Sequence, residues 1–322
     1  MEFKKIAGYF AEANYFWVFA ATVFGILAYW FRAVRWNLLL EPMGYQISNS
    51  NSFWTISFGY LMNLTIPRSG ELARSSALFS VEKVPVEKSF GTIILERVID
   101  LVCMMGFLGL TLIFKYKAIV AFYQYVTAEK QKDVRFEPNL FERYLIDFGI
   151  QNIDSFYFYL KSIIGVLILV FVVYLFITKK EKFINFFKGI LAGLTSIFKM
   201  KQKVKFILLS LGIWICYYFA AYLVCFALPE TSNFTIADGF FIIVVGTLGM
   251  MVPASGGIGA FHLALKFGIM ALFLSMGKNP EEGGEVGLSY AFISHTMQLV
   301  IMVVMGIISI PMLARARAKV SK

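Results

Sequence analysis

The sequence predicts an all-α polytopic membrane protein with two inverted halves, each consisting of a span, a re-entrant hairpin and a second span. Hydrophobic residues make up 59% of the chain, and they occur in runs close to the ~20 residues that cross a bilayer. A Pro-x-Ser-Gly turn occurs twice, at residues 67–70 and 253–256. The loop charges give the segments that carry these two turns opposite orientations.

The first predicted half begins with a span at 15–31, followed by Arg32 and Arg35. Residues 52–80 are apolar but are interrupted at the first turn, and each part is too short to cross a bilayer. We therefore predict a re-entrant hairpin, because irregular backbone at membrane depth must be buried in protein or face a water-filled cavity. A long helix at 88–114 completes this half.

The second half repeats the order, with a span at 206–228, a hairpin at 238–276 and a span at 288–311. A single span at 162–178 joins the two halves and inverts one relative to the other. Phenylalanines recur at helical spacing in 179–205, which is typical of a helix on the membrane surface.

Segment 179–205 carries eight lysines against one glutamate, so it and the basic C-terminal tail are expected in the cytoplasm. The net charge of +10 is explained by such loops, and no nucleic-acid partner is expected. The whole chain, 1–322, is interpreted as a single transmembrane domain. Its expected parts are the first inverted half at 15–114, the outer loop, linking span and cytoplasmic surface helix at 115–205, the second inverted half at 206–311, and the basic cytoplasmic tail at 312–322.

The first turn carries the strongest candidates for a binding site. Arg68, Glu71 and Arg74 are spaced by three residues, which would place them on one helical face beside Ser69. Charges inside a bilayer are costly and normally pair or face water. They would form either a cationic pocket that binds a lipid phosphate through forked arginines, or a hairpin tip whose charges pair with each other or with headgroups.

Glu96, Arg97 and Asp100 lie in the first half of the long helix at 88–114. They would form a structural ion-pair cluster or act directly on the substrate or on protons. Because the first turn has an excess of positive charge and these three residues have an excess of negative charge, we expect them to pair with Arg68 and Arg74.

The second turn contains Pro253, Ser255, Gly256 and Gly257. Its glycines would let backbone N–H groups approach an anion at the start of the next helix, or would simply allow close helix packing. His262 would titrate near neutral pH or serve as an interior residue. His295 and Gln298 share a face of the last span and are further candidates for lining a cavity.

The remaining special residues are interpreted as structural. The three cysteines lie in apolar runs and the two histidines have no acidic or thiol partner at metal spacing, so we expect neither a metal nor a cofactor. No nucleophile and base pair indicates an enzyme. The tryptophans are interpreted as anchors at the membrane interface, and they are Trp17, Trp30, Trp36, Trp54 and Trp214.

Three motifs together resemble the lysylphosphatidylglycerol synthase transmembrane-region family, also called flippase-like. They are NLTIPRSGELAR at 63–74, SFGTIILERVIDLV at 89–102 and MVPASGGIGAFH at 251–262, and the resemblance extends from Ala33 to the C-terminus. It implies movement of lipids or polyprenyl-linked lipids between leaflets. Some members carry a fused aminoacyl transferase, which this chain does not show, and members often begin with one additional helix.

The leading hypothesis is a translocator of an anionic phospholipid or polyprenyl-linked lipid in a bacterial cytoplasmic (inner) membrane, with membrane lipids as its partners. One alternative is a secondary transporter of a small anion, in which Glu71 or Asp100 carries a coupling proton. Another is a membrane partner of a cytosolic or membrane-bound lipid-modifying enzyme that docks on 179–205. A homo-oligomer is compatible with each hypothesis.

Overall fold

The computed structural model describes residues 3–132, 180–252 and 254–320, with short fragments between 143 and 167. Within these ranges the protein is all helical, with no strand, which confirms the predicted all-α class. The chain divides into two compact units, 127–188 and a larger unit of 1–126 with 189–322. All of the geometry below concerns this larger unit, which we call the main unit.

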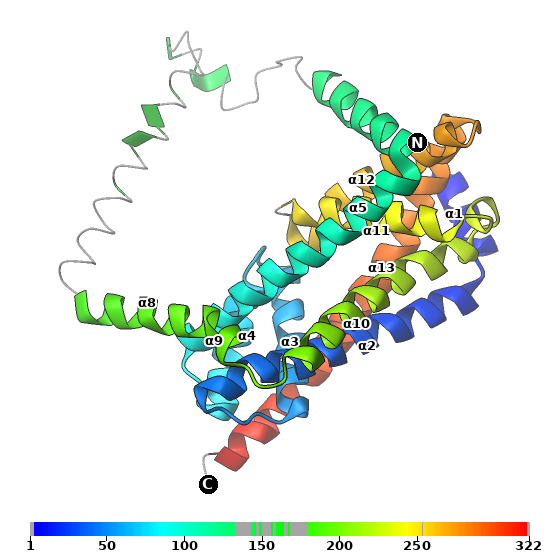
Figure 1. The fold of residues 1–322 in the computed structure, drawn as a ribbon. Helices are drawn as coiled ribbons and strands as arrows, with labels where there is room; N and C mark the ends of the chain where they lie inside the picture. The colour runs from blue at the N-terminus through cyan, green and yellow to red at the C-terminus, as the bar shows by residue number, and fades with distance from the viewer. Residues whose placement is uncertain are drawn as a thin grey trace. The chain divides into compact units, whose positions relative to one another are not determined.

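The order of elements is span, short helix, turn, short helix and long helix, and it occurs twice (Figure 1). The first series is α2 (Tyr15–Leu40), η1 (Glu41–Met43), α3 (Asn49–Thr65), α4 (Gly70–Glu82) and α5 (Val86–Lys132), preceded by α1 (Phe3–Glu12). Next come α8 (Lys180–Leu194) and α9 (Ser196–Lys199). The second series is α10 (Lys203–Tyr222), η2 (Leu223–Ala227), η3 (Pro229–Thr231), α11 (Ile236–Met251), η4 (Ser255–Gly257), α12 (Ala260–Ser275) and α13 (Pro280–Val320).

Five helical segments among the described residues are long and apolar enough to cross a membrane, which supports an integral membrane protein. They are Tyr15–Met43, Val86–Ala128, Lys203–Ala227, Ser255–Ser275 and Pro280–Val320. Four of them correspond to predicted spans. The exception is Ser255–Ser275, which lies within the predicted second hairpin. Most of the predicted linking span at 162–178 lies outside the described residues.

The first span is longer than predicted. The prediction ended at residue 31 because two arginines follow, but α2 continues through Arg32 and Arg35 to Leu40. Both arginines are buried and form ion pairs with Asp100 of α5. A charge-based boundary fails here because the charges are satisfied inside the protein rather than by water.

The tips of the two hairpins are in contact. Helices α3 and α4 form the first hairpin and α11 and α12 form the second, with turns at 66–69 and 252–259. Arg68 in the first turn donates a hydrogen bond from Nη2 to the backbone carbonyl of Met251. Leu64 packs against Gly256 of the second turn. The two turns that resemble each other in sequence are therefore neighbours in space.

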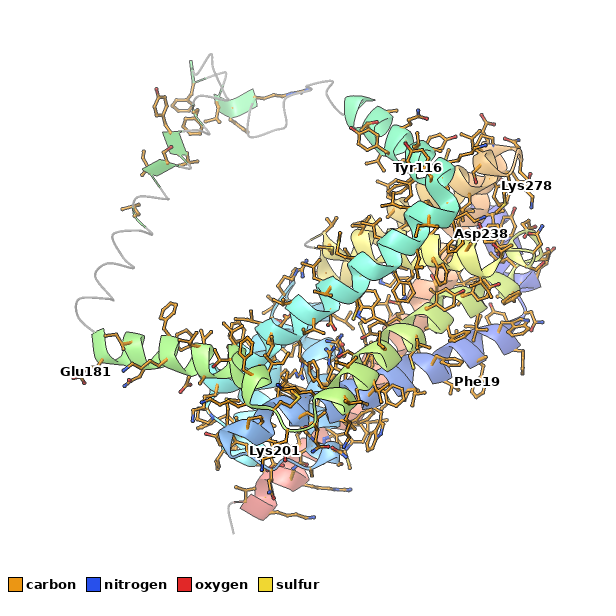
Figure 2. The ribbon with its side chains drawn as sticks, in the orientation of Figure 1. Phe19, Tyr116, Glu181, Lys201, Asp238 and Lys278 are labelled. Atoms are coloured by element: carbon orange, nitrogen blue, oxygen red, sulfur yellow. The ribbon has the colours of Figure 1, made fainter. Side chains whose placement is uncertain are left out.

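The bases of the hairpins lie far apart along α5. This helix begins directly after α4, at the base of the first hairpin. Its Lys115 forms an ion pair with Asp238 at the start of α11, with Nζ and Oδ1 2.6 Å apart. The stretch from 86 to 115 rises roughly 45 Å at ~1.5 Å per residue. Figure 2 shows Asp238 and Lys278 at one end of the bundle and Lys201 at the other.

Helices α2 and α10 pack side by side in opposite directions. The Asn14 amide before α2 donates to the Ala227 carbonyl, 2.9 Å away, whereas Gln202 before α10 donates to Glu41 at 3.2 Å. Large apolar side chains are exposed on the outer faces of several helices. They include Val98, Val102 and Met105 of α5, Ile207, Leu208 and Leu211 of α10, and Val300, Ile307 and Ile310 of α13. Such a surface fits a hydrocarbon environment.

The first hairpin depends on a close approach of its two helices, and replacing Gly70 by alanine tests this. A Cβ at Gly70 would overlap the backbone carbonyl of Gly59 and the side chain of Asn63. We expect Gly70→Ala to destabilise the protein by about 1–3 kcal/mol, measured by thermal unfolding in detergent. Gly106→Ala is the matched control, because a Cβ there meets nothing within 4 Å. Equal unfolding midpoints for both variants would contradict the prediction.

Candidate functional site

A cavity of about 600 Å³ lies within the main unit, and residues of both hairpins contribute to its lining. Its walls come from α2, α3, α4, α5, α10, α11, α12 and α13, together with the first turn. Most lining side chains are apolar or aromatic, which is typical of ligand sites. The charged residues that line it are Arg32, Arg68, Glu71, Arg97 and Asp100.

One side of the cavity rests on a buried network of five charged side chains from three helices. Asp100 accepts hydrogen bonds from Arg32 Nη2 and Arg35 Nη1, both at 2.9 Å. Glu96 accepts one from Arg74 Nη1 at 2.7 Å and one from Arg35 Nη2 at 3.5 Å. All five residues are buried, and Glu96 is 0% exposed. The network therefore ties α2, α4 and α5 together, and we call it the buried ion network.

Aromatic and hydroxyl groups complete the surroundings of this network. The Arg74 guanidinium lies over the Trp36 ring, with Cζ 3.5 Å from the ring centroid. Trp36 is fully buried and donates from Nε1 to Thr92 Oγ1 at 2.8 Å. Its predicted role as an interfacial anchor is therefore wrong, because it supports a buried cation instead. On the α10 side, Arg35 donates to Ser210 Oγ at 3.3 Å.

The buried ion network does not balance its own charge. Three arginines face two carboxylates, which leaves an excess of one positive charge. Several guanidinium nitrogens are also buried without a hydrogen-bond partner among the described residues, and they are Nε of Arg32, Arg35 and Arg74 and Nη2 of Arg74. Arg32 is one of the described residues that line the cavity, whereas Arg35 and Arg74 lie behind its wall.

A second ion pair lies at the edge of the cavity. Arg97 Nη2 and Glu71 Oε1 are 2.7 Å apart, and their side chains are 50% and 20% exposed. Arg68 is also exposed, and its guanidinium contacts the Met251 carbonyl rather than a carboxylate. Leu101 and Met251 are about half exposed and line the cavity as well. These exposed lining residues mark the mouth of the cavity on the outer surface of the main unit.

The structure revises the predicted face of the first hairpin. Arg68 does not share a helical face with Glu71 and Arg74, because α4 begins at Gly70 and Arg68 has a left-handed backbone with φ of 63°. The hydroxyl of Ser69 donates to the backbone carbonyls of Met62, in the last turn of α3, and of Ile66, and Ser69 does not line the cavity. The expected cross-pairing with α5 occurs for Arg74, which pairs with Glu96, but not for Arg68. Glu71 also pairs with α5, through Arg97, which was not expected.

The glycine-rich second turn makes a hydrogen bond with α13. Gly256 has φ of 60°, which favours glycine, and its carbonyl oxygen lies 2.9 Å from Nε2 of the buried His295. Ser255, Gly256 and Gly257 form η4, and the following helix begins at Ala260. These three residues are not part of the described cavity lining, so an anion site at this turn stays a prediction.

The two histidines lie together behind the second turn. The His262 ring packs against Phe292 and His295, with ring centroids 4.4 Å and 4.9 Å apart. Neither histidine lines the described cavity, whereas Gln298 does. Pro253, the remaining candidate of this turn, lies outside the described residues.

Sequence reasoning missed Arg32, Arg35 and Trp214. The two arginines were counted as loop charges, although a spacing of three places them on one helical face. The spacing of four between Glu96 and Asp100 likewise places two carboxylates on one face of another helix. That complementarity is the signal that could have identified them. Trp214 lines the cavity and is almost fully buried, so its predicted position at the interface is wrong. No local pattern distinguishes it from an interfacial tryptophan.

Two glutamates that differ in burial provide a matched test of the buried ion network. Glu96→Gln would leave Arg35 and Arg74 buried without full charge compensation, so we expect a loss of about 3–5 kcal/mol. Glu71→Gln removes a partner from a half-exposed pair, which should cost about 0–1 kcal/mol. Thermal unfolding in detergent measures both. A Glu71→Gln variant less stable than Glu96→Gln would show that the network does not hold the helices together.

Comparisons with known proteins agree with the motif resemblance in the first part of the chain. A UPF0104 membrane protein, MJ1595 of Methanocaldococcus jannaschii, is 27% identical over 106 residues. The aligned region covers 32% of this chain and 32% of that relative, so it spans about a third of the relative's length. No solved structure matches. The motif at 251–262 lies beyond the family match, which also begins before Ala33. Residues 1–130 match the family described as the lysylphosphatidylglycerol synthase TM region, and this match identifies the family to which the first part of the chain is similar.

Proposed function

We propose that the protein moves an anionic phospholipid or polyprenyl-linked lipid between the leaflets of a membrane. In this proposal the headgroup passes through the cavity beside the two turns, while the acyl or prenyl tails stay in the bilayer. The observation that carries it is a cavity of about 600 Å³ with excess positive charge that opens beside exposed apolar side chains. The membrane family matched by residues 1–130 gives independent support for a lipid-related function.

The charges near the cavity favour a negatively charged headgroup. Among the described lining residues, Arg32, Arg68 and Arg97 exceed Glu71 and Asp100 by one positive charge. Behind this lining, the buried ion network supplies two further arginines and one further carboxylate. The combined excess is two positive charges in a region of low dielectric constant, where charge interactions are strong. Guanidinium groups bind phosphate oxygens in a forked geometry.

The mouth of the cavity favours a lipid over a small soluble anion. Leu101 and Met251 are 49% and 51% exposed and also line the cavity. Their neighbours on α5, Val98, Val102 and Met105, continue the apolar surface away from the mouth. A headgroup bound near Arg97 could therefore keep its tails against these side chains. A transporter of a small soluble anion would also expose apolar side chains to the bilayer, but it would not need its cavity to open at that surface.

We further propose that the two hairpins are re-entrant and enter from opposite leaflets. Helix α3 has 17 residues and α11 has 16, so each rises about 25 Å, less than the ~30 Å hydrocarbon core. The bases of the hairpins are separated along α5, and their tips touch between those bases. Interrupted helices in two inverted halves are a common design of transporter sites. From the lysines and arginines of 179–205 and of the C-terminal tail, we also propose that this tail lies in the cytoplasm and that the membrane is the cytoplasmic (inner) membrane.

Transport of a fluorescent anionic phospholipid into the inner leaflet of reconstituted liposomes tests the proposed function. We expect Arg97→Gln to reduce the rate by about tenfold, because the lost charge-assisted hydrogen bonds are each worth about 1.5–3 kcal/mol. Arg315→Gln is the matched control, because Arg315 is exposed in the C-terminal part of α13. If liposomes with the unmodified protein transport the lipid no faster than protein-free liposomes, translocation is excluded. Unchanged transport in Arg97→Gln would exclude the cavity mouth as its route.

The opposed entry of the hairpins predicts the side from which each base is labelled. Ser50 and Ser232 are exposed, and they lie near the bases of the first and second hairpins. In a background without the native cysteines, Ser232→Cys should react with an impermeant maleimide in intact cells. Ser50→Cys should react only after the membrane is permeabilised. Labelling of both positions from one side would contradict opposite entry.

A further inference from the structure

Residues 198–205 cross the junction of α9 and α10 and carry four exposed lysines, and we call them the basic segment. The lysines are Lys199, Lys201, Lys203 and Lys205. None of them forms an ion pair with another described residue. The carboxylate of Glu41 reaches this junction, where it accepts a hydrogen bond from Gln202 at 3.2 Å. The basic segment therefore presents an excess of positive charge on the surface of the main unit, at the end marked by Lys201 in Figure 2.

Apolar side chains are exposed among these lysines. Phe198 is 78% exposed and Val204 is 72% exposed. The exposed apolar face of α10 begins directly afterwards, at Ile207 and Leu208. Lys205 and Ile207 are two residues apart, which is roughly 3 Å along a helix. The lysines therefore lie at the edge of the hydrocarbon-facing surface, at the depth of lipid headgroups.

The inner side of the basic segment is fixed in the main unit. Met200 is buried, and it packs in one cluster with Leu39 of α2, Leu95 of α5 and Phe206 of α10. The Phe206 ring in turn lies 5.9 Å from Cζ of Arg35, a member of the buried ion network. The lysines are therefore carried by a backbone that is anchored between three spans.

The chemistry of this surface fits anionic lipid headgroups. Lysines next to a span attract an anionic membrane surface, and each one strengthens the attraction by about fivefold. The lysine ammonium is a compact point charge without the forked geometry of arginine. We therefore expect the segment to respond to the charge of a lipid and not to the structure of its headgroup. The exposed Phe198 and Val204 favour a lipid surface over a soluble acidic partner, because they continue into the bilayer-facing side of α10.

We propose that the basic segment binds the headgroups of anionic phospholipids in the leaflet that it faces. Phe198 and Val204 then lie among the upper parts of the acyl chains. No residue of the basic segment is part of the described cavity lining, so these lipids are distinct from a lipid that passes through the cavity. The inference therefore goes beyond the proposed function and does not depend on it.

Quenching of a fluorophore at position 198 tests the proposal in the full-length protein. The fluorophore is attached to Phe198→Cys in a background without the native cysteines. The protein is placed in phosphatidylcholine nanodiscs that contain a minor share of phosphatidylglycerol or phosphatidylserine. In separate samples the anionic lipid or an equal amount of phosphatidylcholine carries a nitroxide near its headgroup. We expect quenching to report at least about fivefold enrichment of either anionic lipid over phosphatidylcholine.

A fourfold substitution tests whether the lysines cause this enrichment. Replacing all four lysines by glutamine should remove it, and all four are exposed, so the packing beneath them is kept. Ile236→Cys is the matched label position, because Ile236 is 63% exposed at the start of α11 and the nearby Lys115 and Asp238 pair with each other. Both kinds of lipid should quench equally there. Raising the salt concentration from about 0.01 M to about 1 M should reduce the enrichment at position 198 in the protein that retains its lysines.

The contrary outcomes are distinct. Equal quenching by anionic and neutral lipids at position 198 would overturn the proposal. Enrichment that persists in the glutamine variant, or that does not change with salt, would overturn the lysines as its cause. Quenching by neither lipid would place the segment away from the bilayer and favour a soluble acidic partner instead. Each of these results would leave translocation through the cavity standing.

Discussion

The buried ion network is the interaction on which the rest of the main unit depends. Glu96 and Asp100 of α5 together bind arginines from α2 and α4, and Arg35 also reaches α10 through Ser210. None of these charges could be buried alone in an apolar protein, because an unpaired buried ion is strongly disfavoured. The first hairpin therefore packs against α5 together with α2. The ion pair that compensates the charge of Arg74 also positions the hairpin.

The network also gives the neighbouring cavity its electrostatic character. Because arginine exceeds carboxylate within it, the packing that stabilises the hairpin leaves a positive field that the protein itself does not cancel. The half-exposed pair of Glu71 and Arg97 lies at the mouth, where solvent or a ligand can reach it. In the proposed function, structural support and ligand attraction would come from two neighbouring groups of ion pairs, which differ mainly in how deeply they are buried.

The sequence was sufficient for the features that depend on local chemistry. The Pro-x-Ser-Gly turns indicated two interrupted hairpins, and the opposite charges of 68–74 and 96–100 indicated that these segments pair. Long-range burial was not predictable in the same way. Arg32 and Arg35 follow an apolar run, as loop charges do, and only the carboxylates of another helix make them interior residues. Trp36 and Trp214 resemble interfacial anchors until the helices that cover them are known.

The contact between Arg68 and Met251 has a mechanical consequence. It joins the two tips through a backbone carbonyl, which carries only a partial charge and binds guanidinium less strongly than a phosphate does. An anion that captured the Arg68 guanidinium would release Met251 and uncouple one tip from the other. Anion binding and the hydrogen bond between the two turns would then compete for the Arg68 side chain. A bound anion would therefore itself separate the tips of the two hairpins.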